Sequence, residues 1–123
     1  MTLVLLLLLT MPLDQKCVTY EPDQVVLKGT IRRHTFPGPP NYESIAKGDR
    51  PETYWLLHLE QPICVSASSQ WEPEAGVSDV QLIIMKYDKT LVGRKVVATG
   101  TLFQAHTGHH HTPVVLTVSS IRR

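Results

Sequence analysis

The chain lacks the excess of one charge sign that marks many nucleic-acid-binding proteins. Its 12 Lys and Arg residues nearly balance its 11 Asp and Glu residues, and the formal net charge is +1. The basic residues are scattered along the chain, so they provide no concentrated positive field that could displace counterions from a nucleic acid. We therefore expect no nucleic-acid partner.

Long hydrophobic runs are also missing. The longest apolar stretch, Leu3–Leu13, is about half of the roughly 20 residues that a membrane-spanning helix needs. No stable membrane span is expected, and the stretch favours the core of a secretory signal peptide over an uncleaved anchor or a chance apolar start. No Lys or Arg precedes it and no A-x-A-like site follows it. We predict a signal peptide, or a remnant of one, over residues 1–16, a single domain over residues 17–123, and a secreted or periplasmic protein.

Cysteine is scarce, because the chain contains only Cys17 and Cys64. Neither has a second Cys or a His at the spacing of a metal site, which makes paired Cys ligands the weaker alternative. In an oxidising compartment an even pair usually forms a disulfide. Cys17 precedes the first predicted strand and Cys64 ends the second, and these two ends are neighbours in an antiparallel pair. We predict a Cys17–Cys64 bridge.

Length and composition allow one modest hydrophobic core, since 42% of the 123 residues are apolar. Alternating apolar residues predict five strands. They are Val25–Arg33, Tyr54–Val65, Val80–Met85, Lys95–Phe103 and Pro113–Ile121. The segment between the third and fourth strands, Lys86–Gly93, has room for only one short helical turn. Gly29 permits the sharp bend of a strand that serves two sides of a barrel. The pattern predicts an all-β fold, a small five-stranded OB-like barrel, with an SH3-like barrel or a small sandwich as alternatives.

The segment His34–Glu52 contains four prolines and two glycines and has no sustained period, so it is predicted to be a long loop. Loops of this length in compact domains are usually functional or disordered. Phe36, Tyr42 and Ile45 argue against disorder, because a solvated linker has no use for large apolar groups. We expect those side chains to pack the loop onto the domain.

The segment Gln104–Pro113 carries four of the six histidines and lies between the last two predicted strands, as the tip of a hairpin. A two-residue turn at Thr107-Gly108 would place His106, His109 and His111 on one face, where they could bind a metal. That register would turn the apolar residues of one strand away from the core. An odd-numbered loop, which pairs His106 with His110, keeps these apolar residues buried and is favoured. Turning the apolar face of a strand toward solvent would cost about 1.5–3 kcal/mol for each side chain.

Three interpretations of this hairpin tip remain open. The histidines could hydrogen-bond within the tip or face solvent, or they could bind Zn or Cu through His106, His109, His110 and His111. In the third interpretation the tip and the long first loop flank one binding face, as the corresponding loops do in OB-folds. The predicted ligand-binding residues are then Phe36, Asn41, Tyr42, Glu43, His106 and His110. The ligand would be a small molecule, a glycan or a protein loop, held in an amphipathic and pH-sensitive cleft.

Catalysis is the weakest functional hypothesis. Ser44 is not part of a G-x-S-x-G nucleophile elbow, and the two cysteines are better explained as a bridge. A metal-assisted hydrolase would need a carboxylate base near the histidines, and Glu43 is the only candidate. An exported binding or accessory module is therefore predicted first, a divalent-metal-binding protein second and a metal-assisted hydrolase third.

Three stretches of the chain resemble a known family. They are FPGPPNYESI (Phe36–Ile45), ETYWLLHLEQPICV (Glu52–Val65) and GTLFQAHTGHHHTPVVLTV (Gly100–Val118). They are similar to a family of exported bacterial proteins known as a domain of unknown function, number 4431, over about residues 17–118. The resemblance implies an exported bacterial protein and carries no assigned activity and no catalytic residues.

Overall fold

The computed structural model describes residues 16–123, and the predicted signal peptide falls almost entirely outside this range. The fold is all-β, as predicted. Five strands make up the domain: β1 (Val25–Pro37), β2 (Pro51–Val65), β3 (Glu74–Ile83), β4 (Lys95–Gln104) and β5 (Val114–Arg122). Two single 3-10 turns complete it, η1 (Ile45–Lys47) and η2 (Lys89–Leu91). The turn predicted between the third and fourth strands is η2. No helix in the described residues is long and apolar enough to cross a membrane.

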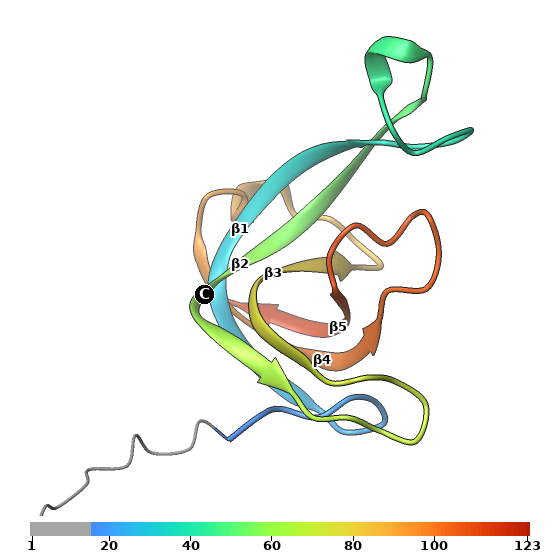
Figure 1. The fold of residues 1–123 in the computed structure, drawn as a ribbon. Coiled ribbons are helices and arrows are strands. Elements are labelled where there is room, and N and C mark those ends of the chain that lie inside the picture. Colours follow the sequence, from blue (N-terminus) through green and yellow to red (C-terminus); the bar gives the residue numbers. More distant parts are fainter. Residues whose placement is uncertain (1–15) are drawn as a thin grey trace, which may run out of the picture.

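The strands close into one barrel, which confirms the predicted five-stranded architecture (Figure 1). The order around the barrel is β1-β2-β3-β5-β4, and β4 returns to pair with β1. The β3–β5 pair is parallel and all other pairs are antiparallel. The loop between β1 and β2 and the loop between β4 and β5 lie on the same side of the barrel (Figure 1).

Gly29 lies where β1 passes from one neighbour to the other, as predicted. Its register partners are Leu59 of β2 and Val96 of β4. A Cβ at this position would lie 2.3 Å from the carbonyl oxygen of His58, closer than any real contact. Only glycine allows the two backbones to approach so closely at the bend.

The core residues follow the predicted alternation. In β2, Trp55, Leu57, Leu59 and Val65 are buried. The pairing of β2 with β3 shifts register between His58 and Ile63, next to Pro62, which has no amide hydrogen to donate to the ladder. The predicted disulfide between Cys17 and Cys64 is present and closes a separation of 47 residues. On the chain-entropy account, a loop of this length stabilises the fold by about 4 kcal/mol.

The first and second strands are longer than predicted, and the difference matters for the site. β1 continues to Pro37 and β2 begins at Pro51, so the ends of the predicted loop His34–Glu52 are paired strand. We call the outer part of this pair, residues 34–37 and 51–54, the ribbon. Residues 38–50, which connect its two strands, are the ribbon tip (Figure 1). Two prolines end the ladder without breaking it, since proline is tolerated at strand ends. β3 likewise begins earlier than predicted, at Glu74.

Candidate functional site

The ribbon tip touches the loop that joins β4 to β5, which we call the His tip (residues 105–113). The ring of Tyr42 lies directly on Gly108, where an added Cβ would come within 2.7–2.9 Å of three ring carbons. Tyr42 adopts a positive φ of 56°, which is uncommon for a residue other than glycine. Its hydroxyl lies 3.4 Å from Nε2 of His109. Two segments that are distant in sequence are therefore neighbours, as the barrel topology led us to expect.

Glu52, at the start of β2, joins the ribbon to two histidines of the His tip. Its Oε2 lies 2.6 Å from Nδ1 of His109, and its Oε1 lies 3.4 Å from Nε2 of His111. The carboxylate is only 17% exposed and the His111 side chain only 11% exposed. Nδ1 of His109 forms a hydrogen bond with this carboxylate, whereas Oε1 of Glu52 and Nε2 of His111 are buried without a hydrogen-bond partner among the described residues. Glu52 therefore fixes the distance between the two loops.

Asp49 organises the ribbon tip from inside. Its side chain is 5% exposed and accepts hydrogen bonds of 2.9 Å from the backbone amides of Asn41, Glu43 and Ser44. The amides of Ser44, Glu43 and Asn41, in that order, lower the pKa of Asp49, because they stabilise its charged form. The tip is thus an ordered loop, and Tyr42 is carried in the middle of it.

Gln81, in the middle of β3, holds the His tip against the barrel. It is 1% exposed. Its Nε2 donates to the carbonyl oxygen of His109, and its Oε1 accepts from the backbone amide of His111. Thr112, also buried, accepts from the Gln81 backbone amide and donates to the carbonyl oxygen of Val114. Sequence reasoning missed Gln81 and Asp49, although a glutamine within the apolar run VQLIIM was the available signal.

Inside the His tip, His106 and His110 pair with each other. Leu102 is opposite Leu116 in the β4–β5 ladder, so the buried register has prevailed over the two-residue turn. Nδ1 of His110 accepts hydrogen bonds from the backbone amides of His106 and Thr107. Its ring packs edge-on against Phe103, with centroids 5.0 Å apart. Burial, and then the neighbouring histidines, lower the pKa of His110.

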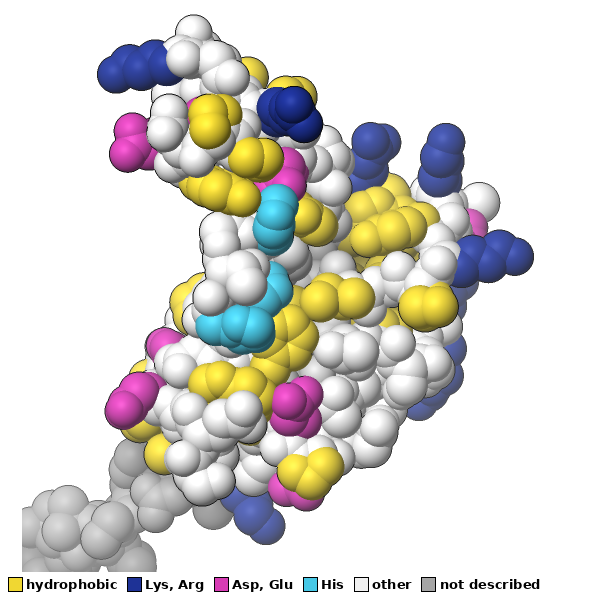
Figure 2. Space-filling model, turned by 90° about the vertical axis from the view of Figure 1, so that its right-hand side faces the viewer, with side chains coloured by type: hydrophobic (Ala, Val, Ile, Leu, Met, Phe, Trp, Pro, Cys, Tyr) yellow, Lys and Arg dark blue, Asp and Glu magenta, His cyan; other side chains and the backbone are white. Residues whose placement is uncertain are grey.

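A row of aromatic rings runs from the ribbon to the His tip. The rings of Phe36 and His111 are stacked, 4.2 Å apart and nearly parallel at 2°. His34 follows on the other side of Phe36 at 4.4 Å. Figure 2 shows histidines and hydrophobic side chains gathered where the molecule narrows between the protruding ribbon tip and the barrel body.

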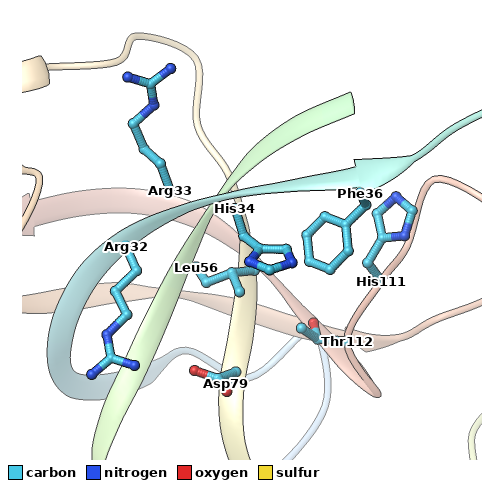
Figure 3. Close-up of a pocket in the computed structure, with 8 residues that line it drawn as sticks. All are labelled: Arg32, Arg33, His34, Phe36, Leu56, Asp79, His111 and Thr112. Carbon is cyan, nitrogen blue, oxygen red and sulfur yellow. The ribbon is translucent and has the colours of Figure 1, made fainter. Parts of the chain in front are cut away.

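An open pocket of about 330 Å³ lies beside this row (Figure 3). Its lining comes from β1, β2, β3 and the His tip. It consists of Arg32, Arg33, His34, Phe36, Leu56, Asp79, His111 and Thr112. In Figure 3, Arg32 and Asp79 lie on one side of Leu56, and the row of rings lies on the other. Oδ1 of Asp79 is 2.9 Å from Nδ1 of His58, a partly exposed residue of β2.

The structure distributes the predicted ligand-binding residues over four places. Phe36 lines the pocket, and Tyr42 closes the gap between the two tips. Asn41 and Glu43 give their backbone amides to Asp49. His106 and His110 lie against Phe103 and are not part of the pocket lining.

The four histidines predicted as metal ligands are split into two pairs. His106 and His110 contact each other, whereas His109 and His111 contact Glu52. Within residues 16–123, no three His, Cys, Asp or Glu side chains form a group that could hold a metal ion. Metal binding by His106, His109, His110 and His111 stays a prediction without a preformed centre to support it.

Fold and site together define a disulfide-linked five-stranded barrel with a pocket where the ribbon and the His tip meet. A disulfide is typical of proteins outside the reducing cytosol. The model of one family, described as Domain of unknown function (DUF4431), matches residues 79–122, and the resemblance to this family is confirmed over that range. The matched range contains the His tip, whereas the stretches Phe36–Ile45 and Glu52–Val65 lie outside it. The comparisons found no match among curated proteins or solved structures.

Proposed function

We propose that this domain is a secreted or periplasmic binding module whose ligand occupies the pocket between the β1–β2–β3 face and the His tip. The observation that carries the proposal is the convergence of ribbon and His tip, which places exposed charged side chains and a row of rings around one cavity. The volume of about 330 Å³ falls at the lower end of ligand pockets, near 300 Å³. A small molecule or one residue of a glycan fits such a space.

The position of the pocket supports the same proposal. In OB-fold barrels the face of the second and third strands, with the loops after the first and fourth strands, binds oligonucleotides and oligosaccharides. The balanced charge of this chain argues against a nucleic acid. The lining residues include no serine or cysteine, and the hydroxyl of Thr112 already donates to the carbonyl oxygen of Val114, so binding explains the geometry better than hydrolysis does.

An NMR titration tests the proposal. Glucose, N-acetylglucosamine, benzoate and a tripeptide are added in turn to the ¹⁵N-labelled domain. We expect at least one probe to shift the amides of His34, Phe36 and Asp79 and to lose this effect in Phe36→Ala. Val26→Ala is the matched control, because Val26 is a 59% exposed apolar residue of the same strand that does not line the pocket.

Two results would contradict the proposal. One is that none of the probes shifts the pocket amides. The other is that the probes act only at the depression beside Trp55 and Leu91, which lies outside the site.

A further inference from the structure

We infer that the ligand of this pocket is an acidic saccharide, a pyranose that carries a carboxylate. The inference rests on the proposed binding function and adds the chemical class of the ligand. Three features of the lining carry it: Arg32, which has no charged partner in residues 16–123, one half-engaged carboxylate and an exposed ring surface.

The first feature is uncompensated positive charge. Arg32 forms no hydrogen bond or ion pair with another side chain in residues 16–123, whereas Arg33 points away from the rings and from Asp79 (Figure 3). The acidic side chains nearby are already engaged, Asp79 with His58 and Glu52 with His109 and His111. A guanidinium presents a planar fork of donors that matches a carboxylate in two parallel hydrogen bonds. An anionic ligand would supply the partner that residues 16–123 do not.

The second feature is Asp79, which a simple anion would leave without a hydrogen-bond donor. Its Oδ1 is held by His58, whereas Oδ2 takes part in no hydrogen bond within the described part of the chain. An ionised carboxylate only accepts hydrogen bonds and arginine only donates them. A ligand that satisfies both must donate and accept, and the hydroxyl groups of a sugar do both.

The third feature is the surface of the ring row. His34, at the outer end of the row, is exposed, and Phe36 is half-buried between His34 and His111. Aromatic faces carry partial negative charge, so the C–H groups on one side of a pyranose pack favourably against them. Leu56 forms an apolar floor between the rings and the charged groups (Figure 3). A ligand with one apolar face and a charged, hydroxyl-bearing edge is complementary to this lining.

A matched pair of sugars tests the inference. Methyl β-D-glucuronide and methyl β-D-glucoside differ only in the carboxylate, and each is titrated into the ¹⁵N-labelled full chain. We expect the glucuronide to bind roughly tenfold or more tightly, because hydrogen bonds to charged groups are the strong ones. Arg32→Gln should abolish that difference. Arg122→Gln, which changes an exposed arginine of β5 outside the pocket, should preserve it.

Three outcomes overturn the inference. Equal binding of both sugars at the pocket would show that the carboxylate is not recognised, and it would leave the proposed binding function intact. If sodium acetate binds with the same affinity as the glucuronide, the sugar ring does not contribute to recognition. If neither sugar shifts the pocket amides, the saccharide class is wrong, and the wider probe panel then decides the binding function by itself.

Discussion

At the scale of single residues, buried polar side chains determine where the two loops lie. Gln81 is enclosed in the barrel wall, yet its amide group bonds two backbone groups of the His tip. Asp49 plays the same part in the ribbon tip by accepting from three amides. In each case a loop without regular structure satisfies its backbone groups through one side chain, which is how an irregular segment can be ordered.

Replacing Gln81 with leucine should detach the His tip from β3. The substitution retains apolar bulk but leaves the carbonyl of His109 and the amide of His111 without partners. Each such buried group costs about 1–3 kcal/mol. We expect the free energy of unfolding, measured in urea, to fall by at least about 1 kcal/mol.

The matched control is Gln61→Leu, at an exposed position of β2. It should change the free energy of unfolding by no more than about 0.5 kcal/mol. Equal stability of the two variants would show that the Gln81 hydrogen bonds do not hold the loop.

At the scale of elements, the five strands could be predicted because apolar alternation reports burial directly. The ribbon could not, since His34, Phe36, Thr53 and Tyr54 lie outside the barrel core and carry no alternation toward it. The prolines that suggested a loop stand at the ends of the ladder, where they are tolerated. The facing of the two strands beside the His tip was predictable, because burial of both Leu102 and Leu116 excludes the two-residue turn. The exact register was not, since the ladder ends at Gln104 and Val114 and His106 meets His110 inside the loop.

The His tip should loosen in acid. Nδ1 of His110 accepts two backbone hydrogen bonds, and a proton on this atom would abolish both. The pKa of His110 is below its ordinary value of 6.5, with burial the largest cause. The folded chain therefore binds this proton less readily than the unfolded chain. The stabilisation is complete above about pH 6.5 and is lost as the pH falls through the lower folded pKa.

An NMR titration from pH 7.5 to 4.5 measures this effect residue by residue. The amides of His106 and Thr107 should move together, with a midpoint below 6.5, and should exchange faster with solvent. The amides that Asp49 accepts from are an internal control, because the pKa of Asp49 is lowered from 3.8 and its carboxylate stays charged over this range. A midpoint above 6.5, or no movement at His106 and Thr107, would contradict the account.

At the scale of the whole molecule, the site exists because barrel closure brings two distant segments to one side. The topology was sufficient to predict that the loop after β1 and the loop after β4 are neighbours. It was not sufficient to predict how they touch. Glu52, Asp79 and Arg32 enter the site only through side-chain positions on neighbouring strands and the His tip, for which the sequence offers no periodic signal.

The contact between Tyr42 and Gly108 is the most direct test of the claim that ribbon and His tip form one site. The measurement is a NOESY spectrum of the domain near neutral pH. We predict cross-peaks between the Tyr42 ring protons and the Gly108 α-protons, with those α-protons shifted upfield by the ring and returning toward random-coil values in Tyr42→Ala. Unshifted α-protons with no cross-peak would show that the two loops are apart and that the pocket is not formed.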